Sequence, residues 1–383
     1  MHDLPPLEQG HLPLGVRARF IDGVNGLKLH ILEAGFEQPG RPLILLLHGF
    51  PELAYSWRKV MVPLAAAGFH VVAPDQRGYG RTQGWSADFD QDLRPFSMLH
   101  LTRDALALVF ALGHRSIPAV VGHDFGSPVA AWCALTRPDV FRSVVLMSAP
   151  FAGPPALPFE AAPPSAVATS ETEGTADALA ALSPPRKHYH WYYSTPQANR
   201  DMWHSPQGMH AFLRAYFHHK SADWPDNAPY RLKEWSAAEL AKLPTYYVMD
   251  RAKTMPETVA PFMPAAAQIA SCEWLSETGM GVYAAEYIRT GFQGGLNWYR
   301  TRFDAGLNAE LMLYAGRTID VPSMFIAGKS DWGVYQVPGA YERMQHKVCT
   351  QMTASHLIDG AGHWVMQEQP GPVSELLVTF CKQ

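Results

Sequence analysis

The segment between residues 117 and 137 constrains the fold of this chain more than any other. It runs from a short valine-rich stretch, through the pentapeptide GHDFG at 122–126, into an apolar stretch of helical length that stops before Pro138. A strand that turns sharply into a helix is typical of a parallel sheet with helical cover. The glycines give the backbone room for the turn, which would present Asp124 at its tip. Ligands of such sheets bind beyond the carboxyl ends of the strands, so we expect Asp124 to lie where chemistry takes place.

Other segments on both sides of the pentapeptide show the same alternation of strand-like and helix-like patterns. Short continuous apolar runs predict strands that are buried on both faces, and apolar residues at helical spacing predict helices between them. The predicted strands are two within 16–34, joined by a turn at Asn25-Gly26, and one each at 42–47, 69–73, 117–121, 143–147, 321–328 and 355–361. The predicted helices are 98–113, 126–137 and 373–382.

The composition and the hydrophobic pattern of the sequence change after residue 149. Residues 150–185 are rich in Pro, Ala, Ser and Thr, which favours a surface loop, and residues 186–315 are aromatic and mainly helical in pattern. The strand and helix alternation returns after residue 321. We therefore predict a sheet domain in two parts, 1–149 and 316–383, interrupted by an inserted helical cap at 150–315.

Composition narrows the classes of function. The chain has 383 residues, a net charge of −4 and 17% charged residues, so neither nucleic acid nor an anionic membrane is expected as a partner. Its four cysteines lack metal-ligand spacing and no phosphate-binding glycine loop is present, so we expect no metal and no organic cofactor. The start, MHDLPPLEQG, lacks the apolar core of a signal peptide, and no run reaches the roughly 18 apolar residues of a membrane helix. These features predict a cytoplasmic protein.

Six motifs, in this order, resemble those of the epoxide hydrolases of the α/β-hydrolase superfamily. The motifs are HGFP (48–51), RGYGRT (77–82), GHDFG (122–126), HYHWYY (188–193), GGLNWYR (294–300) and IDGAGHW (358–364). The resemblance extends from about residue 16 to the end of the chain. It implies an α/β-hydrolase fold, with a mostly parallel sheet flanked by helices and an inserted, mainly helical cap.

The chemistry of a carboxylate at the tip of the turn agrees with this resemblance. A carboxylate that attacked an ordinary ester would form an anhydride, whereas attack on a saturated carbon with a strained ring or a good leaving group forms an alkyl ester. The resemblance implies that Asp124 is this nucleophile. It also implies that His363 activates the water that hydrolyses the ester, a task suited to an imidazole.

The position of the acid that orients His363 follows from the strand order. Asp331 comes three residues after the strand predicted at 321–328, whereas Asp320 precedes that strand and would lie at its other end. Some relatives place the acid after the preceding strand, but residues 147–150 read MSAP here. Asp331 is therefore the preferred acid, and the order of nucleophile, acid and histidine agrees with the superfamily.

The resemblance also implies the groups that stabilise negative charge. Tyr189 and Tyr299 are the expected proton donors to the opened epoxide oxygen, and Tyr192 and Tyr193 compete for the first role. The backbone amides of Phe50 and Phe125 are the expected oxyanion hole, so their phenyl rings should matter less than their backbone positions.

Aromatic residues of the cap favour an apolar or aromatic epoxide, which together with water would be the substrate. Five residues are expected near it: His48, Pro51, Trp191, Trp298 and Trp364. We also interpret His48 and His123 as supports of the HGFP loop and of the GHDFG turn.

Two alternatives stay open from the sequence. A dehalogenase could use the same nucleophile, and the pair His190-Trp191 resembles a halide pocket. Haloalkane dehalogenases, however, usually carry tryptophan where this chain has Phe125, and the arginines of fluoroacetate dehalogenases are missing after the nucleophile. The other alternative is a non-catalytic binding protein of the same fold, against which the complete set of Asp124, Asp331 and His363 argues.

Overall fold

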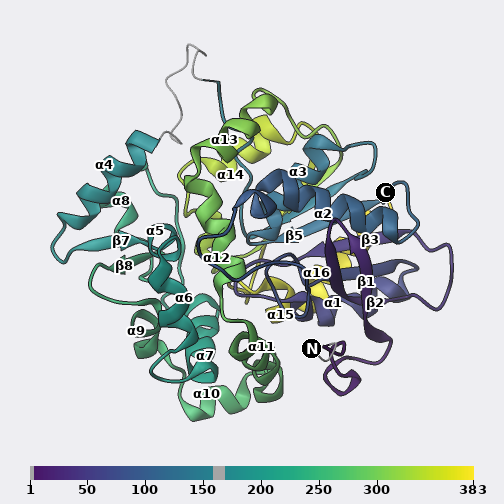
Figure 1. Cartoon of the computed structure of the whole chain (residues 1–383), viewed down its shortest axis with the longest axis horizontal. Helices are drawn as coiled ribbons and strands as arrows, with labels where there is room; N and C mark the ends of the chain where they lie inside the picture. Colours follow the sequence, from purple (N-terminus) through teal and green to yellow (C-terminus); the bar gives the residue numbers. More distant parts are fainter. Residues whose placement is uncertain (1–3, 158–168) are drawn as a thin grey trace.

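An eight-stranded sheet forms the centre of the molecule (Figure 1). The computed structural model describes residues 4–157 and 169–383. The strands are β1 (Val16–Val24), β2 (Leu27–Ala34), β3 (Leu43–Leu47), β4 (His70–Pro74), β5 (Ala119–His123), β6 (Val144–Met147), β9 (Ser323–Gly328) and β10 (Met352–Ile358). Their order is β1-β2-β4-β3-β5-β6-β9-β10. Only the β1–β2 and β2–β4 pairs are antiparallel, so the prediction of a mostly parallel sheet is confirmed.

The predicted turn between the first two strands is also present. Asn25 and Gly26 adopt positive φ angles of 50° and 82° between β1 and β2. Two successive residues with positive φ are what a tight hairpin requires, and asparagine followed by glycine provides them at low cost.

Helices cover both faces of the sheet. Helices α2 (Met98–Ala111) and α3 (Gly126–Thr136) pack on one face, and α1 (Arg58–Ala66) and α16 (Pro370–Cys381) pack on the other. Strand β3 shows why its sequence is apolar without alternation: Leu43, Leu45 and Leu47 join the core under α2 and α3, while Ile44 and Leu46 join the core under α1 and α16.

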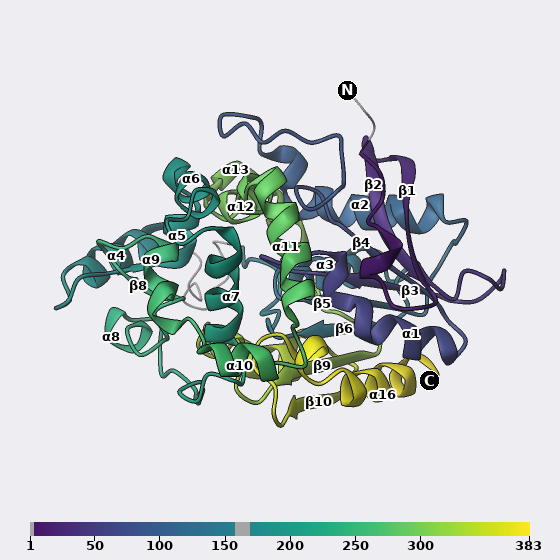
Figure 2. The same ribbon diagram turned by 90° about the horizontal axis from the view of Figure 1, so that it is seen from below.

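The chain between β6 and β9 builds a cap that lies beside the sheet in both views (Figures 1 and 2). Its helices are α4 (Thr169–Ala180), α5 (Tyr189–Tyr193), α6 (Pro196–Trp203), α7 (Met209–Lys220), α8 (Ala237–Leu240), α9 (Met255–Val259), α10 (Ala266–Ser271), α11 (Glu277–Thr290), α12 (Gln293–Arg300) and α13 (Ala305–Leu311). A short antiparallel pair, β7 (Arg186–His188) and β8 (Val248–Asp250), joins them. The boundaries at 149/150 and 315/316 stay a prediction.

Part of the stretch expected to be a surface loop is helical instead. Helix α4 occupies Thr169–Ala180 within the 150–185 segment, because its alanines and leucine favour a helix once the prolines are passed. Residues 158–168 of the same stretch lie outside the described residues.

The remaining elements are short. The other helices are α14 (Ala340–Arg343) and α15 (Val365–Glu368). The 3-10 turns are η1 (Gln9–His11), η2 (Ala54–Trp57), η3 (Arg94–Phe96), η4 (Ala260–Phe262), η5 (Thr301–Phe303), η6 (Met312–Tyr314) and η7 (Trp332–Val334), and η8 (Met344–Val348) is a π-helical turn.

The parallel strands bring four loops to one edge of the sheet. Strands β3, β5, β6 and β9 are neighbours in that order and run in the same direction, so the loops that follow them meet at their carboxyl ends. The loop after β10, the next strand, reaches the same edge. Phe50, Asp124, Asp331 and His363 lie on the loops after β3, β5, β9 and β10, whereas the candidate tyrosines come from the cap.

Candidate active site

The turn between β5 and α3 holds Asp124 in a strained backbone conformation. Asp124 has a φ of 51°, in the left-handed region that non-glycine residues seldom adopt. A Cβ atom at Gly122 would lie 2.0 Å from the carbonyl oxygen of Gly126, and one at Gly126 would lie 2.2 Å from the carbonyl oxygen of Leu47. Gly122 is therefore needed for the close packing of β5 against the start of α3, and Gly126 for the packing of that helix start against the end of β3.

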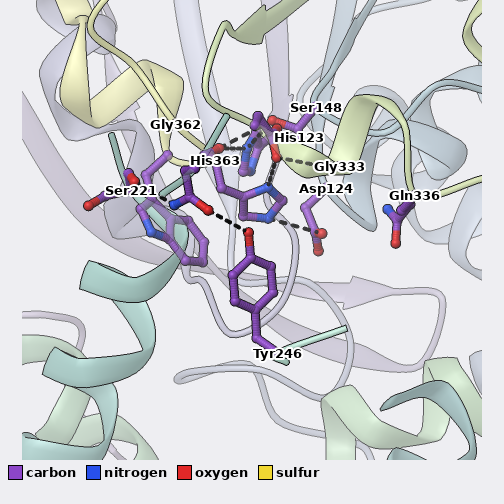
Figure 3. Close-up of polar contacts among 12 residues, drawn as sticks. His123, Asp124, Ser148, Ser221, Tyr246, Gly333, Gln336, Gly362 and His363 are labelled. Carbon is purple, nitrogen blue, oxygen red and sulfur yellow. Dashed lines mark hydrogen bonds and ion pairs between the residues drawn. The ribbon is translucent and has the colours of Figure 1, made fainter. Parts of the chain in front are cut away.

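The carboxylate of Asp124 contacts groups from two other loops. Oδ1 accepts a hydrogen bond from the backbone amide of Phe50, at 2.8 Å. Oδ2 lies 3.3 Å from Nε2 of His363, and Figure 3 shows the two side chains facing each other. Asp124 is only 9% exposed, so these contacts form in a desolvated environment. The amide of Phe125 donates no hydrogen bond within residues 4–157 and 169–383 and is free to serve as a second donor.

The acid expected to orient His363 occupies the predicted place. Oδ1 of Asp331 lies 3.0 Å from Nδ1 of His363 and also accepts the backbone amide of Gly333 at 2.7 Å. Asp320, at the other end of β9, bonds instead to the hydroxyls of Thr318 and Thr350. The loops thus bring Asp124, His363 and Asp331 into one line of contacts.

The charges of this cluster shift the pKa values of its members. Burial acts to raise the pKa of Asp124, but the close contact and charge of His363 and the charge of the buried Lys220 lower it below its usual range. Burial also acts to raise the pKa of Asp331, and the charge and hydrogen bond of His363 again lower it. For His363, burial and Lys220 act to lower the pKa, but the two carboxylates outweigh them and raise it to about 9. The resting site therefore favours an imidazolium between two carboxylates.

Three polar residues hold His363 from behind. Nε2 of His123 donates to the carbonyl oxygen of His363 at 2.7 Å, and Nδ1 of His123 lies 2.5 Å from Oε2 of the buried Glu52. The hydroxyl of Ser148 also donates to the carbonyl of His363, at 3.2 Å (Figure 3). His123 therefore supports the site as interpreted from the sequence. Glu52 and Ser148 were not predicted from the sequence, although Glu52 directly follows the HGFP motif and Ser148 directly follows β6.

Two tyrosines of the cap lie near the turn that carries Asp124. Tyr299 on α12 is 3% exposed, and its ring centroid lies 5.4 Å from Phe50 and 5.1 Å from Phe125, the two residues expected to form the oxyanion hole. Tyr189, at the start of α5, has its ring 5.9 Å from that of Tyr299, and its hydroxyl donates to Gln336 at 3.2 Å. Burial first, and then the charge of Asp124, raise the pKa of both tyrosines well above the usual value, so both stay protonated.

The two competing tyrosines of α5 have their hydroxyls engaged elsewhere. Tyr192 donates to Asp201 on α6 at 3.1 Å, and Tyr193 donates to Tyr216 on α7 at 3.3 Å. Tyr189 also has a hydroxyl partner in Gln336, but besides burial the charge of Asp124 acts on its pKa, whereas Asp201 acts on the pKa of Tyr192 and Tyr216 on that of Tyr193. Proximity to the charge of Asp124 favours Tyr189 as the partner of Tyr299.

Two of the residues expected near a substrate, His48 and Pro51, are buried in the loop that follows β3. Both ring nitrogens of His48 have main-chain partners, with Nδ1 donating to the carbonyl of Gly49 and Nε2 accepting the amide of Gln76. This pattern favours the supporting role of His48 over contact with a substrate. Pro51 is buried and follows a cis peptide bond from Phe50.

The three tryptophans form part of the aromatic surroundings. Trp298 is fully buried and lies edge-on to Phe125, at 5.3 Å between ring centroids. Trp364 is also fully buried and stacks on Phe217 of the cap at 4.2 Å, while Trp191 is half-buried beside His188. Trp298 and Trp364 both donate their indole N–H to backbone carbonyls, so they offer only apolar surface.

Neither a metal cluster nor a membrane span is present in the part of the chain that the structure describes. No group of three or more His, Cys, Asp or Glu side chains among residues 4–157 and 169–383 is placed to hold a metal ion. In the same residues, no helix combines the length and apolar character needed to cross a membrane.

Comparisons with known proteins agree with this geometry. The family model of the alpha/beta hydrolase fold matches residues 42–370. Epoxide hydrolase A of Mycobacterium tuberculosis is 34% identical over 377 residues, which cover 94% of this chain and 96% of the relative. Among solved structures, an epoxide hydrolase from an endophytic Streptomyces superposes with a TM-score of 0.76 at 29% identity, covering 97% of this chain and 96% of that one.

A second solved structure extends the agreement. Epoxide hydrolase A of Mycobacterium thermoresistibile gives a TM-score of 0.72 at 30% identity, with 96% of this chain and 98% of that chain covered. Both the core and the cap are therefore shared with these enzymes. The chain belongs to the α/β-hydrolase family and, within it, to the epoxide hydrolases.

Proposed function

We propose that this enzyme opens an apolar or aromatic epoxide to a vicinal diol through a covalent alkyl ester on Asp124. The observation that carries the proposal is that the two oxygens of this carboxylate have different environments. Oδ1 is bound by the Phe50 amide, whereas Oδ2 faces His363 without the alignment of a hydrogen bond. One oxygen is thus anchored, and the other is available for attack.

In the first step, Oδ2 of Asp124 forms a bond to one carbon of the epoxide. The ring C–O bond breaks, its electron pair goes to the ring oxygen, and Tyr299 or Tyr189 donates a proton to that oxygen. Burial and the charge of Asp124 raise the pKa of both tyrosines in the free enzyme. Since esterification removes that charge, the tyrosines become better donors as the alkoxide forms.

In the second step, His363 takes a proton from water and the resulting hydroxide adds to Cγ of the ester. Negative charge develops on Oδ1, which already receives the Phe50 amide and can also receive the free Phe125 amide. The bond between Cγ and Oδ2 then breaks, His363 gives its proton to Oδ2, and the diol leaves with that oxygen, while the oxygen of the water stays in the carboxyl group of Asp124. The proton of this carboxyl group passes to the tyrosinate left by the first step, which restores the carboxylate and the tyrosine.

The same alkylation prepares His363 to act as a base. In the free enzyme burial and Lys220 oppose protonation, but the charges of Asp331 and Asp124 raise the pKa of His363 to about 9. Conversion of Asp124 to a neutral ester removes one of these two carboxylate charges. The pKa of His363 therefore falls at the stage when a neutral imidazole is required.

The aromatic surroundings support an apolar substrate. Aromatic rings pack edge to face beside the turn that carries Asp124, from Phe50, Phe125, Tyr189, Tyr299 and Trp298. Apolar walls with two neighbouring tyrosines suit an apolar group joined to an epoxide oxygen.

A single turnover in water enriched in heavy oxygen tests the covalent route. We expect the label to enter Asp124, detected by mass spectrometry of the peptide that contains it, and to be missing from the first diol released. Label in the diol and an unlabelled Asp124 would show direct attack by water and overturn the proposal.

A parallel assay tests the rival activity, dehalogenation. Styrene oxide, a chloroalkane and fluoroacetate are offered to the same preparation, with diol and halide measured. Two tyrosine hydroxyls favour an alkoxide leaving group over a halide, so we expect diol from the epoxide and no halide. Halide release without diol formation would assign the site to dehalogenation, and stable ligand binding without turnover over a broad epoxide panel would favour a binding protein.

A further inference from the structure

Lys220 is a buried cation beside the candidate site that neither donates nor accepts a proton in the two steps. It is the last residue of α7, a cap helix that ends against the loop of His363, and it is only 3% exposed. Its backbone carbonyl accepts the amide of His363 at 2.9 Å. The following residue, Ser221, lies beside Gly362 in Figure 3. Lys220 and His363 are thus joined through the main chain.

The contact between this helix end and the His363 loop is tight. A Cβ atom at Gly362 would lie 2.5 Å from the carbonyl carbon of Ser221 and 2.7 Å from the carbonyl oxygen of Lys220. The carboxylate of Glu368 accepts the amides of Ala222, Gly362 and Trp364 at 2.8 to 2.9 Å. Because Glu368 bridges the two segments, the cap cannot move away here without displacing His363.

The ammonium group of Lys220 is surrounded by aromatic rings rather than by acceptors. Nζ lies 5.0 to 5.6 Å from the ring centroids of Tyr216, Tyr246, Tyr247 and Trp364. Within residues 4–157 and 169–383 it has no hydrogen bond and no carboxylate at salt-bridge distance. Cation–π contacts stabilise a charge in such a cage, but they do not replace a full solvation shell. A buried cation in this arrangement acts on its surroundings through its field.

The charged and titratable groups around His363 show what this field acts on. Asp124 and Asp331 contact the imidazole, His123 lies behind it with Glu52, and Glu368 binds the loop amides. The carboxylates of Asp124, Asp331 and Glu52 in turn favour the charged form of Lys220, against the effect of burial, which lowers its pKa. The lysine is therefore a cation that opposes a second positive charge on the nearby imidazole.

We propose that Lys220 is a positioning residue of the second half-reaction, which keeps the imidazole of His363 neutral while the alkyl ester on Asp124 awaits water. This inference rests on the proposed function, because it concerns the ester. We expect its effect mainly on hydrolysis: after esterification the charge of Asp331 favours the imidazolium, and the charge of Lys220 opposes it. In the alkylation step the nucleophile is Asp124, and no neutral imidazole is needed.

The test separates the two half-reactions in the full-length enzyme. Lys220→Met removes the charge at similar side-chain volume, and Lys220→Arg retains it. Formation and decay of the ester are followed between pH 5.5 and 9.5 by rapid quench with styrene oxide and intact-protein mass spectrometry. The midpoint is the pH at which the ester decays at half of its maximal rate. For Lys220→Met we expect this midpoint to rise by about 1 pH unit. At pH values below the midpoint the ester should then decay about tenfold more slowly than in the wild type, and at high pH the two rates should agree. Ester formation should change by less than about threefold, and Lys220→Arg should keep the wild-type midpoint.

Lys187→Met serves as the matched control. Lys187 is a half-buried cap lysine that also lies over a tyrosine ring, at 4.7 Å from the centroid of Tyr192. The charged groups that act on it are Asp201, Glu257 and Arg251, none of which belongs to the site. This variant should leave the midpoint of ester decay unchanged. If Lys220→Met does not fold, Lys220→Gln makes the same comparison against Lys220→Arg.

Several outcomes would overturn the inference. An unchanged decay midpoint in Lys220→Met would show that the charge does not act on His363. An equal loss of ester formation and decay at every pH would show a merely structural role. Turnover without any ester, in the wild type as well as in the variants, would instead overturn the proposed function, and with it the role of Lys220.

Discussion

Nε2 of His363 and Oδ2 of Asp124 lie 3.3 Å apart, in contact but without the alignment of a hydrogen bond. The opposite nitrogen of the same ring is held by Asp331 at 3.0 Å. The imidazole is therefore fixed on one side and loosely engaged on the other. This asymmetry fits a residue that waits beside the nucleophile during the first step and receives a water proton in the second.

Replacement of His363 by glutamine should stop the reaction halfway. Asp124 keeps its anchor on the Phe50 amide, so alkylation should proceed, whereas removal of the general base should slow hydrolysis by about 10²- to 10⁴-fold. Intact-protein mass spectrometry after mixing with styrene oxide should show an adduct of one substrate mass on Asp124. Asp124→Asn is the control, which should show no adduct. A His363→Gln enzyme that is inactive and stays unmodified would contradict the mechanism.

The two cap tyrosines should act on ring opening. Tyr299→Phe and Tyr189→Phe remove the donors while keeping the rings, and each should slow ester formation by roughly 10- to 100-fold, with a larger loss for the double variant. Pre-steady-state measurement of ester formation checks this.

Tyr192→Phe is the matched control for these variants, because Tyr192 shares helix α5 with Tyr189 but directs its hydroxyl to Asp201. It should retain near wild-type rates. Full activity in the double variant Tyr189→Phe/Tyr299→Phe would refute the assignment of the donors.

The oxyanion hole should depend on backbone position rather than on side chains. A Cβ atom at Gly49 would lie 2.3 Å from Cβ of Asp124, so Gly49→Ala must displace the loop that carries the Phe50 amide. We expect kcat to fall by about 10²-fold or more, the size of effect seen when one oxyanion-hole donor is lost.

Phe50→Leu, which keeps that amide, provides the comparison and should lose less than about tenfold. A larger loss for Phe50→Leu than for Gly49→Ala would mean that the ring itself, and not the amide, is the functional group.

The charge cluster should make stability depend on pH in a defined direction. The pKa of His363 is raised from 6.5 to about 9 on folding, so its stabilising contribution is complete below pH 6.5 and is lost as the pH rises through 9. The shift sets an upper bound of roughly 3 kcal/mol. The Tm of the wild type should therefore fall by several degrees between pH 7 and pH 9.5.

His363→Gln provides the reference for this stability measurement, since every other group titrates in both proteins. The Tm difference between the two proteins should shrink over the same range of pH. A difference that is constant from pH 7 to pH 9.5 would show that His363 is not held as an imidazolium in the free enzyme.

Local pattern and sheet topology suffice to predict the central part of this site. The glycines at 122 and 126 indicate the turn, and the rule that parallel strands end at one edge selects Asp331 over Asp320 as the acid. These features depend on short-range sterics and on strand direction, both of which are encoded within a few residues.

Other features depend on contacts that no local pattern encodes. Tyr189, Tyr192 and Tyr193 share the same five-residue helix, where each residue turns the side chain by about 100°, so only their surroundings in the folded protein distinguish them. The contacts of Glu52 and Ser148 with the His363 support likewise arise from loops that meet only in the folded protein. A lysine at the end of a helix is usually exposed to solvent, so the sequence does not predict that Lys220 is buried. Its burial depends on the packing of the cap against the core.

The left-handed backbone at position 124 has a consequence for evolution. Aspartate tolerates this conformation better than most residues do, but glycine adopts it without strain. Glycine at position 124 would therefore stabilise the fold, although it would remove the nucleophile. Lineages that no longer need the activity should therefore drift toward glycine at this position before the remainder of the pentapeptide changes. A homologue with an intact turn but a glycine at its tip would mark a descendant kept for something other than turnover.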